Sequence, residues 1–333
     1  MTETDASAVL QSAVKANRAA EALAAQIFGH GKLRLVGLPA EVAIAGTMTQ
    51  KVCRRIEQSV KRGNRVELID IIVLAVIQGI TEFLPISSSG HLALWPLLTG
   101  RADQGAVMDV AVHVGTLVAV CAFFRIEFAR LLVGAGHVVT GRFGSAEAKL
   151  ALLIAVATVP AVIAGLALKL ADAQAALRAL EVIGWATLIG AGLLWWADRT
   201  APTRGEAEGW SLRDAIVMGL AQALALIPGT SRSGITMTMA RWLGFDRIQA
   251  ARLALLMSIP VILAAGSLET LGVFRDGDFR LGAELLLGAG LSCVAAWLAL
   301  SVMMWMFAAT WTMLPFVIYR AALGIVLLAL AYG

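Results

Sequence analysis

Charge is scarce in this sequence. Only 15% of its 333 residues are charged and 59% are apolar, whereas a soluble globular domain is about 25% charged and about 45–50% apolar. A water-soluble fold has no interior large enough for so much apolar surface. The composition therefore excludes a soluble enzyme, a disordered chain and a nucleic-acid-binding protein, so we expect no nucleic-acid partner.

Cysteine is also scarce. Cys53, Cys121 and Cys293 lie far apart, so they form neither the close pattern of a disulfide framework nor that of a thiolate metal site. Cys121 and Cys293 fall inside apolar runs. We interpret them as small buried hydrophobic residues.

Residues 1–65 differ from the rest of the chain. They carry 10 basic and 5 acidic residues, a net charge of +5, and contain no apolar run long enough to span a bilayer. The pattern of a signal peptide is missing. The basic cluster at 51–65 would suit anionic lipid headgroups, but a solvated tail is the interpretation that we favour. A third alternative is that the chain begins near Val66 and the tail is an artefact.

Residues 66–333 are dominated by apolar segments, and a spanning helix needs about 20 such residues. We predict an all-α polytopic membrane domain with six transmembrane helices, at 106–124, 150–170, 182–196, 251–273, 281–307 and 314–332. Two further apolar segments, 66–98 and 214–243, are interrupted at Pro85 and Pro228. We predict that each forms a re-entrant hairpin of two broken helices.

The two hairpins resemble each other. Four pairs of identical residues share an offset of 144 positions: Gln78/Gln222, Ser87/Ser231, Ser89/Ser233 and Gly90/Gly234. Three spanning helices follow each hairpin, and an odd number of crossings inverts the second repeat relative to the first. The sequence therefore predicts an inverted-topology repeat, in which paired broken helices meet near the midplane and build the functional site.

The distribution of basic residues between loops predicts the orientation. One side receives Arg125, Arg130, Arg142, Lys149, Arg199, Arg204, Arg213, Arg241 and Arg247, and the other side only Arg101, Lys169, Arg178, Arg275 and Arg280. The first side is predicted to be cytoplasmic, which places Val66 and the C-terminus outside. The basic tail conflicts with this orientation, unless it is not made or the first hairpin crosses the membrane.

Polar side chains at bilayer depth are costly and call for a functional explanation. They gather at the two breaks. The first hairpin carries Gln78, Glu82, Ser87, Ser88, Ser89 and His91, and the second carries Gln222, Thr230, Ser231, Arg232, Ser233 and Thr236. Backbone N–H groups freed at a helix N-terminus form an anion site, and the guanidinium fork of Arg232 suits phosphate.

Together these groups can support phosphoryl transfer, which needs charge neutralisation, a nucleophile and a proton carrier. Glu82 can hold a divalent metal or act as an acid or base. Ser88 precedes His91 by three residues, a spacing that puts both on one helix face and allows a Ser–His couple. Structural alternatives stay open: serines often bond to the backbone of membrane helices, and Glu82 and Arg232 can form an ion pair joining the repeats.

Two other polar residues lie in predicted spans. His113 can line the same cavity, although packing against neighbouring helices is the interpretation that we favour. Arg320 is expected to pair with a carboxylate or to face the cavity.

The first motif, 78–91, has the pattern Q-x-x-x-E-F-L-P-I-S-S-S-G-H and closely resembles the first signature of the undecaprenyl-diphosphatase family, bacterial membrane phosphatases linked to bacitracin resistance. The stretch 228–236, P-G-T-S-R-S-G-I-T, resembles the second signature. The resemblance covers about residues 66–333 and does not include the tail.

The resemblance implies hydrolysis of undecaprenyl diphosphate to the monophosphate, which recycles the lipid carrier for cell-wall synthesis. It implies a divalent cation, Mg²⁺ or Ca²⁺, held by Glu82, and a site in the bacterial inner membrane that opens toward the periplasm. Ser88 would be the nucleophile with His91 as its base, or His91 would activate a water molecule. Arg232 would clamp the diphosphate. Gln78 stands where many members have Glu, which puts a metal-ligand role there in doubt.

The other site assignments are for substrate binding: Gln78, Ser87, Ser89, Gly229, Ser231, Ser233 and Thr236. A homodimer is left open. A second class of function is also retained, because inverted repeats with broken helices also describe transporters. In that alternative the chain is a lipid-phosphate transporter or flippase.

Overall fold

The computed structural model describes residues 68–100, 106–171, 174–202, 209–276 and 283–333. The predicted tail, 1–65, lies outside the described residues. Everything described belongs to one compact unit, Arg65–Gly333. Within these ranges the secondary structure is helical throughout, which confirms the predicted all-α class.

The helices follow the chain as the apolar segments predict. Their bounds are α3 Leu68–Thr81, α4 Ser88–Thr99, α5 Ala106–Phe123, α6 Arg125–Val139, α7 Ala146–Leu170, α8 Gln174–Leu177, α9 Leu180–Thr200, α10 Leu212–Leu224, α11 Arg232–Trp242, α12 Arg247–Asp276, α13 Ala283–Ala308 and α14 Leu314–Tyr332.

Five of the described helices, α7, α9, α12, α13 and α14, are long and apolar enough to cross a membrane. Helices α5 and α6 pass the same test only as a pair, bent by 95° after Phe123, which makes them a broken sixth span or a re-entrant loop. The outward faces of these helices carry large apolar side chains such as Ile163, Trp185 and Leu298. Lipid tails are as apolar as these side chains, so such faces are stable in a bilayer. The chain is therefore a multi-pass membrane protein.

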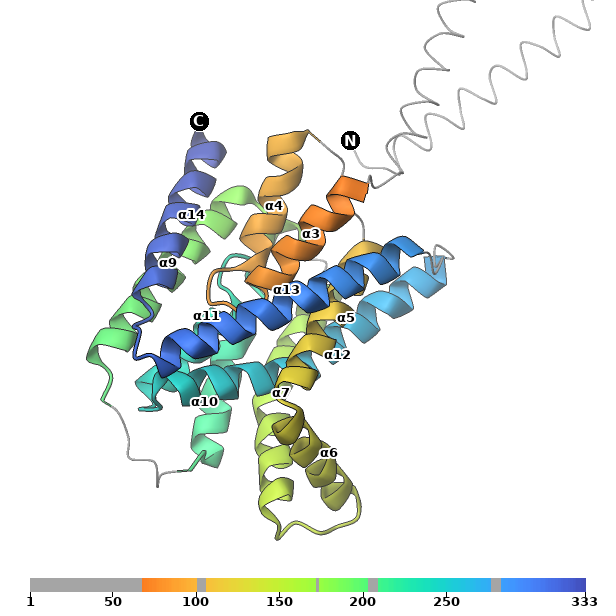
Figure 1. Ribbon diagram of the computed structural model, residues 1–333, viewed down its shortest axis with the longest axis vertical. Coiled ribbons are helices and arrows are strands. Elements are labelled where there is room, and N and C mark those ends of the chain that lie inside the picture. The colour runs from red at the N-terminus through yellow and green to blue at the C-terminus, as the bar shows by residue number, and fades with distance from the viewer. Residues whose placement is uncertain (1–67, 101–105, 172–173, 203–208, 277–282) are drawn as a thin grey trace, which may run out of the picture. The chain divides into compact units, whose positions relative to one another are not determined.

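The two predicted hairpins are the pairs α3–α4 and α10–α11 (Figure 1). None of these four helices is long enough to be counted as a span. In Figure 1 the first hairpin dips in from the upper end of the molecule, whereas α10 rises from the lower end. Opposed entry of two matching hairpins is the arrangement that an inverted repeat requires.

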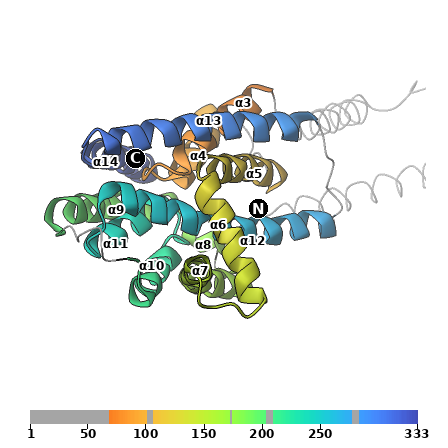
Figure 2. The same cartoon turned by 60° about the horizontal axis from the view of Figure 1, so that its bottom comes forward.

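The hairpin of each repeat packs against a helix of the other repeat. The first hairpin helix, α3, packs on α13 of the second repeat, and its counterpart α10 packs on α7 of the first. Figure 2 shows the result as two layers, with α3, α4, α5, α13 and α14 above α7, α9, α10, α11 and α12. Each layer therefore combines elements of both repeats, which brings the two breaks together.

Helices α9 and α14 meet in a reciprocal contact of small residues. A Cβ atom added at Gly184 would lie 2.6 Å from the Leu328 side chain, and one at Gly324 would lie 2.7 Å from Leu188. Small residues let membrane helices approach closely. The same pair of residue types is used in both directions, as expected for two related halves.

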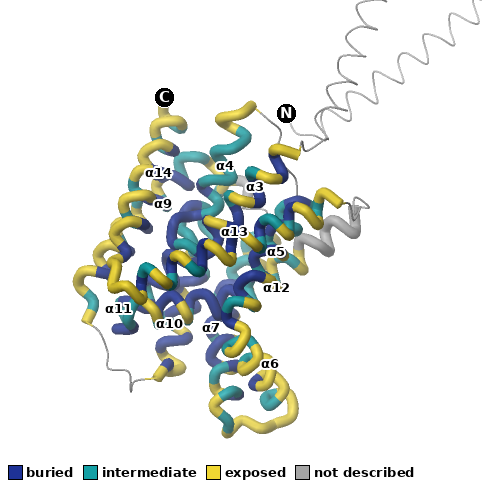
Figure 3. The backbone as a smooth tube through the Cα atoms, in the orientation of Figure 1, coloured by how far each residue is buried: buried dark blue, intermediate teal, exposed yellow. Residues whose placement is uncertain are grey.

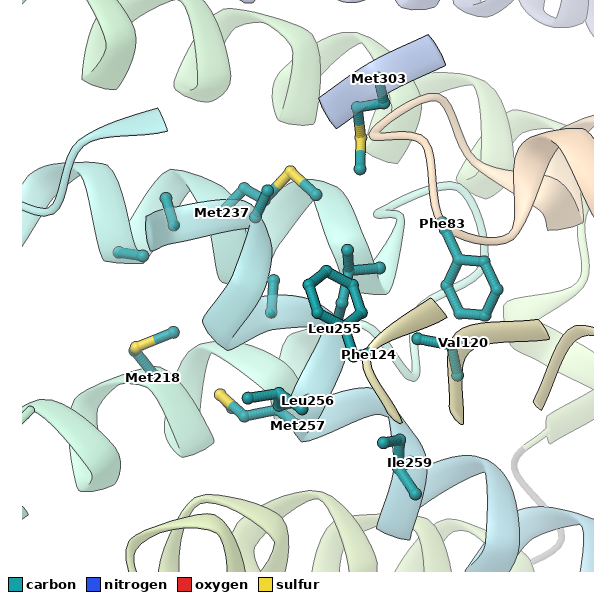
Figure 4. Close-up of a cluster of buried hydrophobic side chains, with 14 of the residues drawn as sticks. Phe83, Val120, Phe124, Met218, Met237, Leu255, Leu256, Met257, Ile259 and Met303 are labelled. Atoms are coloured by element: carbon teal, nitrogen blue, oxygen red, sulfur yellow. The ribbon is translucent and has the colours of Figure 1, made fainter. Parts of the chain in front are cut away.

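The buried centre lies where the hairpins meet the long helices (Figure 3). Its largest apolar cluster includes Phe83, Val120, Phe124, Leu255 and Met303. Phe83 is fully buried in this cluster, beside Val120 (Figure 4). Because Phe83 directly follows Glu82, its packing fixes the backbone from which the Glu82 carboxylate projects.

The predicted loop between the first two spans is wrong. Arg125 and Arg130 lie on α6, which packs along α7 (Figure 1). Arg130 Nε lies 3.7 Å from a carboxylate oxygen of Glu147, and Glu127 forms an ion pair with Arg252 of α12. The segment after Phe124 is too polar to form a span, but a helix with a charged face needs only one packed side.

The predicted loop position of Arg241 is also wrong. Arg241 is a buried residue of α11 whose Nε lies 3.3 Å from Oδ1 of Asp198 in α9. Arg247 Nε contacts the same oxygen at 2.7 Å, and Asp198 Oδ2 accepts a hydrogen bond from the Met313 N–H at 3.1 Å. Because Asp198 pairs with both guanidinium groups, Arg241 can be buried and Arg247 partly buried in this part of the protein.

Candidate active site

The two breaks have the same backbone geometry. Ser87 precedes α4 with φ 76°, and Ser231 precedes α11 with φ 64°. A positive φ is uncommon for residues other than glycine and is found where the surrounding structure enforces it, often at functional sites. In both turns this serine and the one two positions later hydrogen-bond through their hydroxyl groups, at 3.2 Å.

Each break is tied to the other by the later serine of this pair. Ser89 Oγ accepts a hydrogen bond from the Gly229 N–H at 2.9 Å, and the Ser233 hydroxyl donates to the carbonyl oxygen of Leu84 at 2.9 Å. Each contact joins a serine of one hairpin to the backbone of the other, and the second hairpin supplies the donor in both. They hold the N-termini of α4 and α11 against each other, as the repeat predicted.

Glu82 is the centre of the polar cluster. Its Oε1 accepts from Arg232 Nη2 at 2.8 Å, and its Oε2 accepts from Gln78 Nε2 at 2.9 Å and from the Ser88 hydroxyl at 3.1 Å. The Glu82 residue is 9% exposed. The predicted meeting of Glu82, Ser88 and Arg232 is thus present in the structure, and it includes the ion pair that was kept as the structural alternative.

The matched turns carry different chemistry at the same positions. With the offset of 144, Ser88 corresponds to Arg232, and Glu82 corresponds to Leu226. The scaffold is therefore symmetric, while the first hairpin supplies a hydroxyl and a carboxylate and the second supplies a cation. An asymmetric set of this kind can bind an anion at one end and activate a nucleophile at the other.

The N-termini of both hairpin helices point donors at this cluster. Ser231 caps α11 by accepting from the Gly234 N–H at 3.1 Å, whereas Ser87 makes no side-chain cap to α4. The first-turn N–H groups of a helix bind anions. One η nitrogen of Arg232, Nη1, is buried and has no hydrogen-bond partner among the described residues. These donors fit a phosphate group.

A cavity of about 460 Å³ opens beside the cluster. Its charged and polar lining residues are Glu82, His113, Lys169, Arg178, Gln222 and Arg232. The rest of the lining is apolar and comes mostly from α7 and α12, including Ala161, Val162, Leu166, Val261 and Ile262. A smaller hollow of about 190 Å³ is lined by Glu82, Ser88, Ser89, Ser231 and Arg232, with Ala225, Leu226 and Pro228. A cavity lined by both charged and apolar residues suits an amphiphilic ligand.

The predicted Ser88–His91 couple is wrong for this structure. His91 Nδ1 hydrogen-bonds with the carbonyl oxygen of Ser87 at 2.7 Å, and Nε2 with the Tyr319 hydroxyl at 2.6 Å. Both ring nitrogens are thus occupied, and the Ser88 hydroxyl donates to Glu82 instead. The spacing of three places Ser88 and His91 near each other, but His91 hydrogen-bonds with the carbonyl oxygen of Ser87, four residues earlier, instead.

The remaining predicted site residues divide into two groups. Ser89 and Ser231 line the smaller hollow. Ser87, Ser233 and Thr236 are buried, and Thr236 donates to the Arg232 carbonyl at 2.7 Å within its own helix. The buried group therefore shapes the turns, and its assignment to substrate binding stays a prediction.

The glutamines have different partners. Gln78 orients Glu82, as described above. Gln222 Nε2 donates to the carbonyl oxygen of Ala157 in α7 at 3.1 Å. This hydrogen bond joins α10 to α7. Gln222 also lines the larger cavity.

Sequence reasoning underrated three residues. Arg320 is fully buried and donates through Nη2 to the carbonyls of Gly229 and Thr230, at 3.1 and 2.7 Å. It therefore holds the second turn. Among the described residues no ion pair joins it to a carboxylate, so that expectation is wrong for this part of the chain. Tyr319 holds His91, and His113 lines the cavity. The signal was present for Arg320, because an arginine within a span is costly.

The donor set can hold a divalent cation only together with a ligand. No group of three or more His, Cys, Asp or Glu side chains suited to a metal occurs in the part of the chain that the structure describes. Glu82 contributes one carboxylate. Mg²⁺ is commonly bound by one or two carboxylates plus the phosphates of a substrate, so the residues fit a cation that a diphosphate completes.

The fold and the site define a class: a polytopic membrane protein with inverted repeats, whose broken helices meet at a cluster suited to a phosphate-bearing lipid. A family model described as "Bacitracin resistance protein BacA" matches residues 71–326. The chain belongs to this family.

Curated relatives support the same assignment. The undecaprenyl-diphosphatase of Dinoroseobacter shibae is 52% identical over 266 residues, which cover 80% of this chain and 99% of the relative. That of Ruegeria pomeroyi is 51% identical over the same shares. That of Alteromonas mediterranea is 49% identical over 262 residues, 78% of this chain and 97% of the relative.

Proposed function

We propose that this protein hydrolyses undecaprenyl diphosphate to undecaprenyl phosphate and inorganic phosphate, and so recycles the lipid carrier for cell-wall synthesis. The observation that carries the proposal is the Glu82–Arg232–Ser88 cluster at the junction of the two hairpins, opening into a cavity with apolar walls. The names of the relatives support the substrate. The bacterial inner membrane and a periplasmic opening belong to the same proposal.

Arg232 binds the diphosphate. Its Nη2 is held by Glu82 and its Nη1 is without a protein partner among the described residues. A guanidinium oriented by a carboxylate loses little freedom when it binds an anion, and a planar fork matches two phosphate oxygens. The first-turn amides of α4 and α11 add donors for the charge that grows on the phosphoryl oxygens. The prenyl chain lies along the apolar walls of the cavity.

The bond that breaks joins the terminal phosphorus to the bridging oxygen, which leaves with the lipid monophosphate. The new bond forms from the terminal phosphorus to the oxygen of Ser88 or of a water molecule. Ser88 donates to Glu82 Oε2, so Glu82 is in place to accept the proton in either route. If Ser88 attacks, water then hydrolyses the phosphoserine. His91 holds the Ser87 turn and is not within these hydrogen bonds.

The predicted cofactor is a divalent cation, Mg²⁺ or Ca²⁺, held by Glu82 and the diphosphate. When bound, it would neutralise negative charge on the phosphate oxygens. The protein groups that orient its carboxylate ligand are Gln78, Ser88 and Arg232.

The test is the release of inorganic phosphate from C55 prenyl diphosphate by purified protein in detergent. Arg232→Lys keeps a charge but loses the fork, and should lower kcat/KM by about 10²–10³-fold, the effect of removing one donor from such a site. Arg130→Lys, on exposed α6, is the matched control and should keep wild-type rates. Equal rates in Arg232→Lys and wild type would contradict the site.

A lipid-phosphate transporter or flippase is the second candidate, because the inverted repeat of broken helices is shared with transporters. Vesicles containing a fluorescent prenyl phosphate distinguish the two. Movement of the lipid between leaflets without phosphate release would favour the transporter, and phosphate release lost in Arg232→Lys would favour the enzyme.

A further inference from the structure

His113 has a defined tautomer in the cavity wall. It lies on α5, and its Nδ1 is 2.7 Å from the carbonyl oxygen of Asp109 one turn earlier. A carbonyl oxygen can only accept a hydrogen bond, so Nδ1 carries the proton. In the neutral ring the lone pair is then on Nε2, on the opposite side of the ring from the helix carbonyl.

That nitrogen faces Glu82. Nε2 of His113 lies 4.0 Å from Glu82 Oε2, and both residues line the larger cavity. Zinc bonds to imidazole nitrogen and carboxylate oxygen are each about 2.0–2.2 Å long, so a separation of 4.0 Å lets both atoms reach one ion placed between them. Gln222, which lines the same cavity, has a buried Oε1 with no hydrogen-bond partner among the described residues.

We propose that His113 Nε2 is a second protein ligand, beside Glu82 Oε2, for a divalent cation in this cavity. Ligating histidines usually donate their other ring N–H to a carbonyl or carboxylate, which fixes the ring and the tautomer. The bond from His113 to Asp109 has this form. The inference rests on the proposed function in one respect, since the diphosphate oxygens complete the coordination.

The assignment also concerns Ser88. The Glu82 oxygen nearest to His113 is the one that accepts the Ser88 hydroxyl. The same oxygen accepts from Gln78 Nε2. If Oε2 held a cation, these two hydrogen bonds would be weakened and the Ser88 hydroxyl would be available to the phosphate. Occupancy of the site and orientation of Ser88 are therefore linked through one oxygen atom.

A nitrogen ligand changes which metals bind best. Sites made only of oxygen favour Mg²⁺ and Ca²⁺, whereas imidazole favours later transition metals, with affinity rising from Mn²⁺ to Zn²⁺. We therefore expect Mn²⁺ and Zn²⁺ to bind more tightly than Mg²⁺ and Ca²⁺. Replacing His113 by Gln, which offers oxygen in place of nitrogen, should reduce this preference.

The experiment measures Mn²⁺ on the full chain in detergent by electron paramagnetic resonance. A prenyl methylenediphosphonate, which cannot be hydrolysed, is present to complete the site. The wild type should show coupling of Mn²⁺ to a directly bound nitrogen. His113→Gln should lose that coupling and weaken Mn²⁺ binding at least about tenfold. His137→Gln is the matched control, since His137 lies on α6 and bonds Ser145, and it should keep both.

Three results would overturn the proposal: bound Mn²⁺ without nitrogen coupling, no Mn²⁺ binding with the analogue present, or coupling that survives in His113→Gln. Loss of coupling in His91→Gln but not in His113→Gln would instead assign His91. Phosphate release is measured separately on the same preparations. Hydrolysis without nitrogen coupling rejects only the role of His113, and coupling without hydrolysis rejects only the proposed function.

Discussion

At the scale of single residues, the carboxylate of Glu82 organises the site. It receives one guanidinium, one amide and one hydroxyl, from Arg232, Gln78 and Ser88. Three donors on one buried carboxylate fix its position to within a narrow range. The residue that binds the phosphate and the residue that can attack it are thereby held by the same group.

Ser88 decides between the two chemical routes. If its hydroxyl attacks the phosphorus, Ser88→Ala should lower kcat by roughly 10³-fold or more, since a triad-like nucleophile cannot be replaced. If water attacks, the loss should be about tenfold, because only one hydrogen bond to Glu82 disappears. Single-turnover phosphate release measures the difference. Ser267→Ala, on an exposed part of α12, is the control and should leave kcat unchanged.

A direct check for the covalent route is the trapping of phosphoserine by acid quench during turnover, followed by mass spectrometry. A phosphorylated peptide containing Ser88 would establish the first route. A quenched sample without it, taken while phosphate is being released, would leave attack by water.

At the scale of elements, the second turn depends on a helix from the far end of the chain. Arg320 of α14 donates to the carbonyls of Gly229 and Thr230, and its side chain occupies the space beside Gly190 and Gly234. A Cβ atom at Gly190 would lie 2.0 Å from the guanidinium. The absence of side chains at both glycines shows that the packing is built around the arginine.

Removing this arginine should therefore displace the turn that presents Arg232. Arg320→Met has a similar length but removes the donor from the Thr230 carbonyl, at a cost of about 1–3 kcal/mol. The Gly229 carbonyl keeps its hydrogen bond from the Thr187 hydroxyl. We expect a lower Tm in detergent and a loss of phosphate release. Arg320→Lys, which can satisfy one carbonyl, should fall between Met and wild type. A Tm and an activity of Arg320→Met equal to wild type would contradict this role.

The sequence predicted the elements better than the contacts. The spans, the two breaks and the offset of 144 followed from apolar run length and repeated residues, and the structure has them. The bend after Phe123 did not follow, because α6 is too polar to resemble a span and its partner surface on α7 is not visible in its own residues.

Side-chain partners were harder to predict for the same reason. Ser88 and His91 have the spacing of a couple, yet each has a stronger partner elsewhere, Glu82 for the hydroxyl and Tyr319 for the ring. Tyr319 is 228 positions from His91. Contacts of such separation depend on how α14 packs against α9 and α4, which no local pattern contains.

At the scale of the whole molecule, the two repeats enter from opposite ends and share one site. The C-terminus of α14 and the turn between α6 and α7 lie at opposite ends of the molecule (Figure 1). The distribution of basic residues predicts that the α6–α7 turn is cytoplasmic. The orientation can be measured at these two points.

Cysteine labelling gives that measurement. Gly144 is exposed and an added Cβ there meets nothing within 4 Å, so Gly144→Cys should be tolerated. In a background without Cys53, Cys121 and Cys293, we expect Gly144→Cys to react with an impermeant maleimide only in inverted vesicles, and Gly333→Cys to react in intact cells. The reverse pattern would contradict the predicted orientation and the periplasmic opening.

The central claim is that the Glu82 cluster hydrolyses a lipid diphosphate with the help of a divalent cation. The most direct measurement is phosphate release from C55 prenyl diphosphate with Mg²⁺, with Ca²⁺ and with EDTA, for wild type, Glu82→Ala and Glu127→Ala, whose partner Arg252 lies outside the cluster. We predict release by wild type and Glu127→Ala that stops in EDTA, and none by Glu82→Ala. Release by folded Glu82→Ala at the wild-type rate, or none by folded wild type with metal present, would contradict the account.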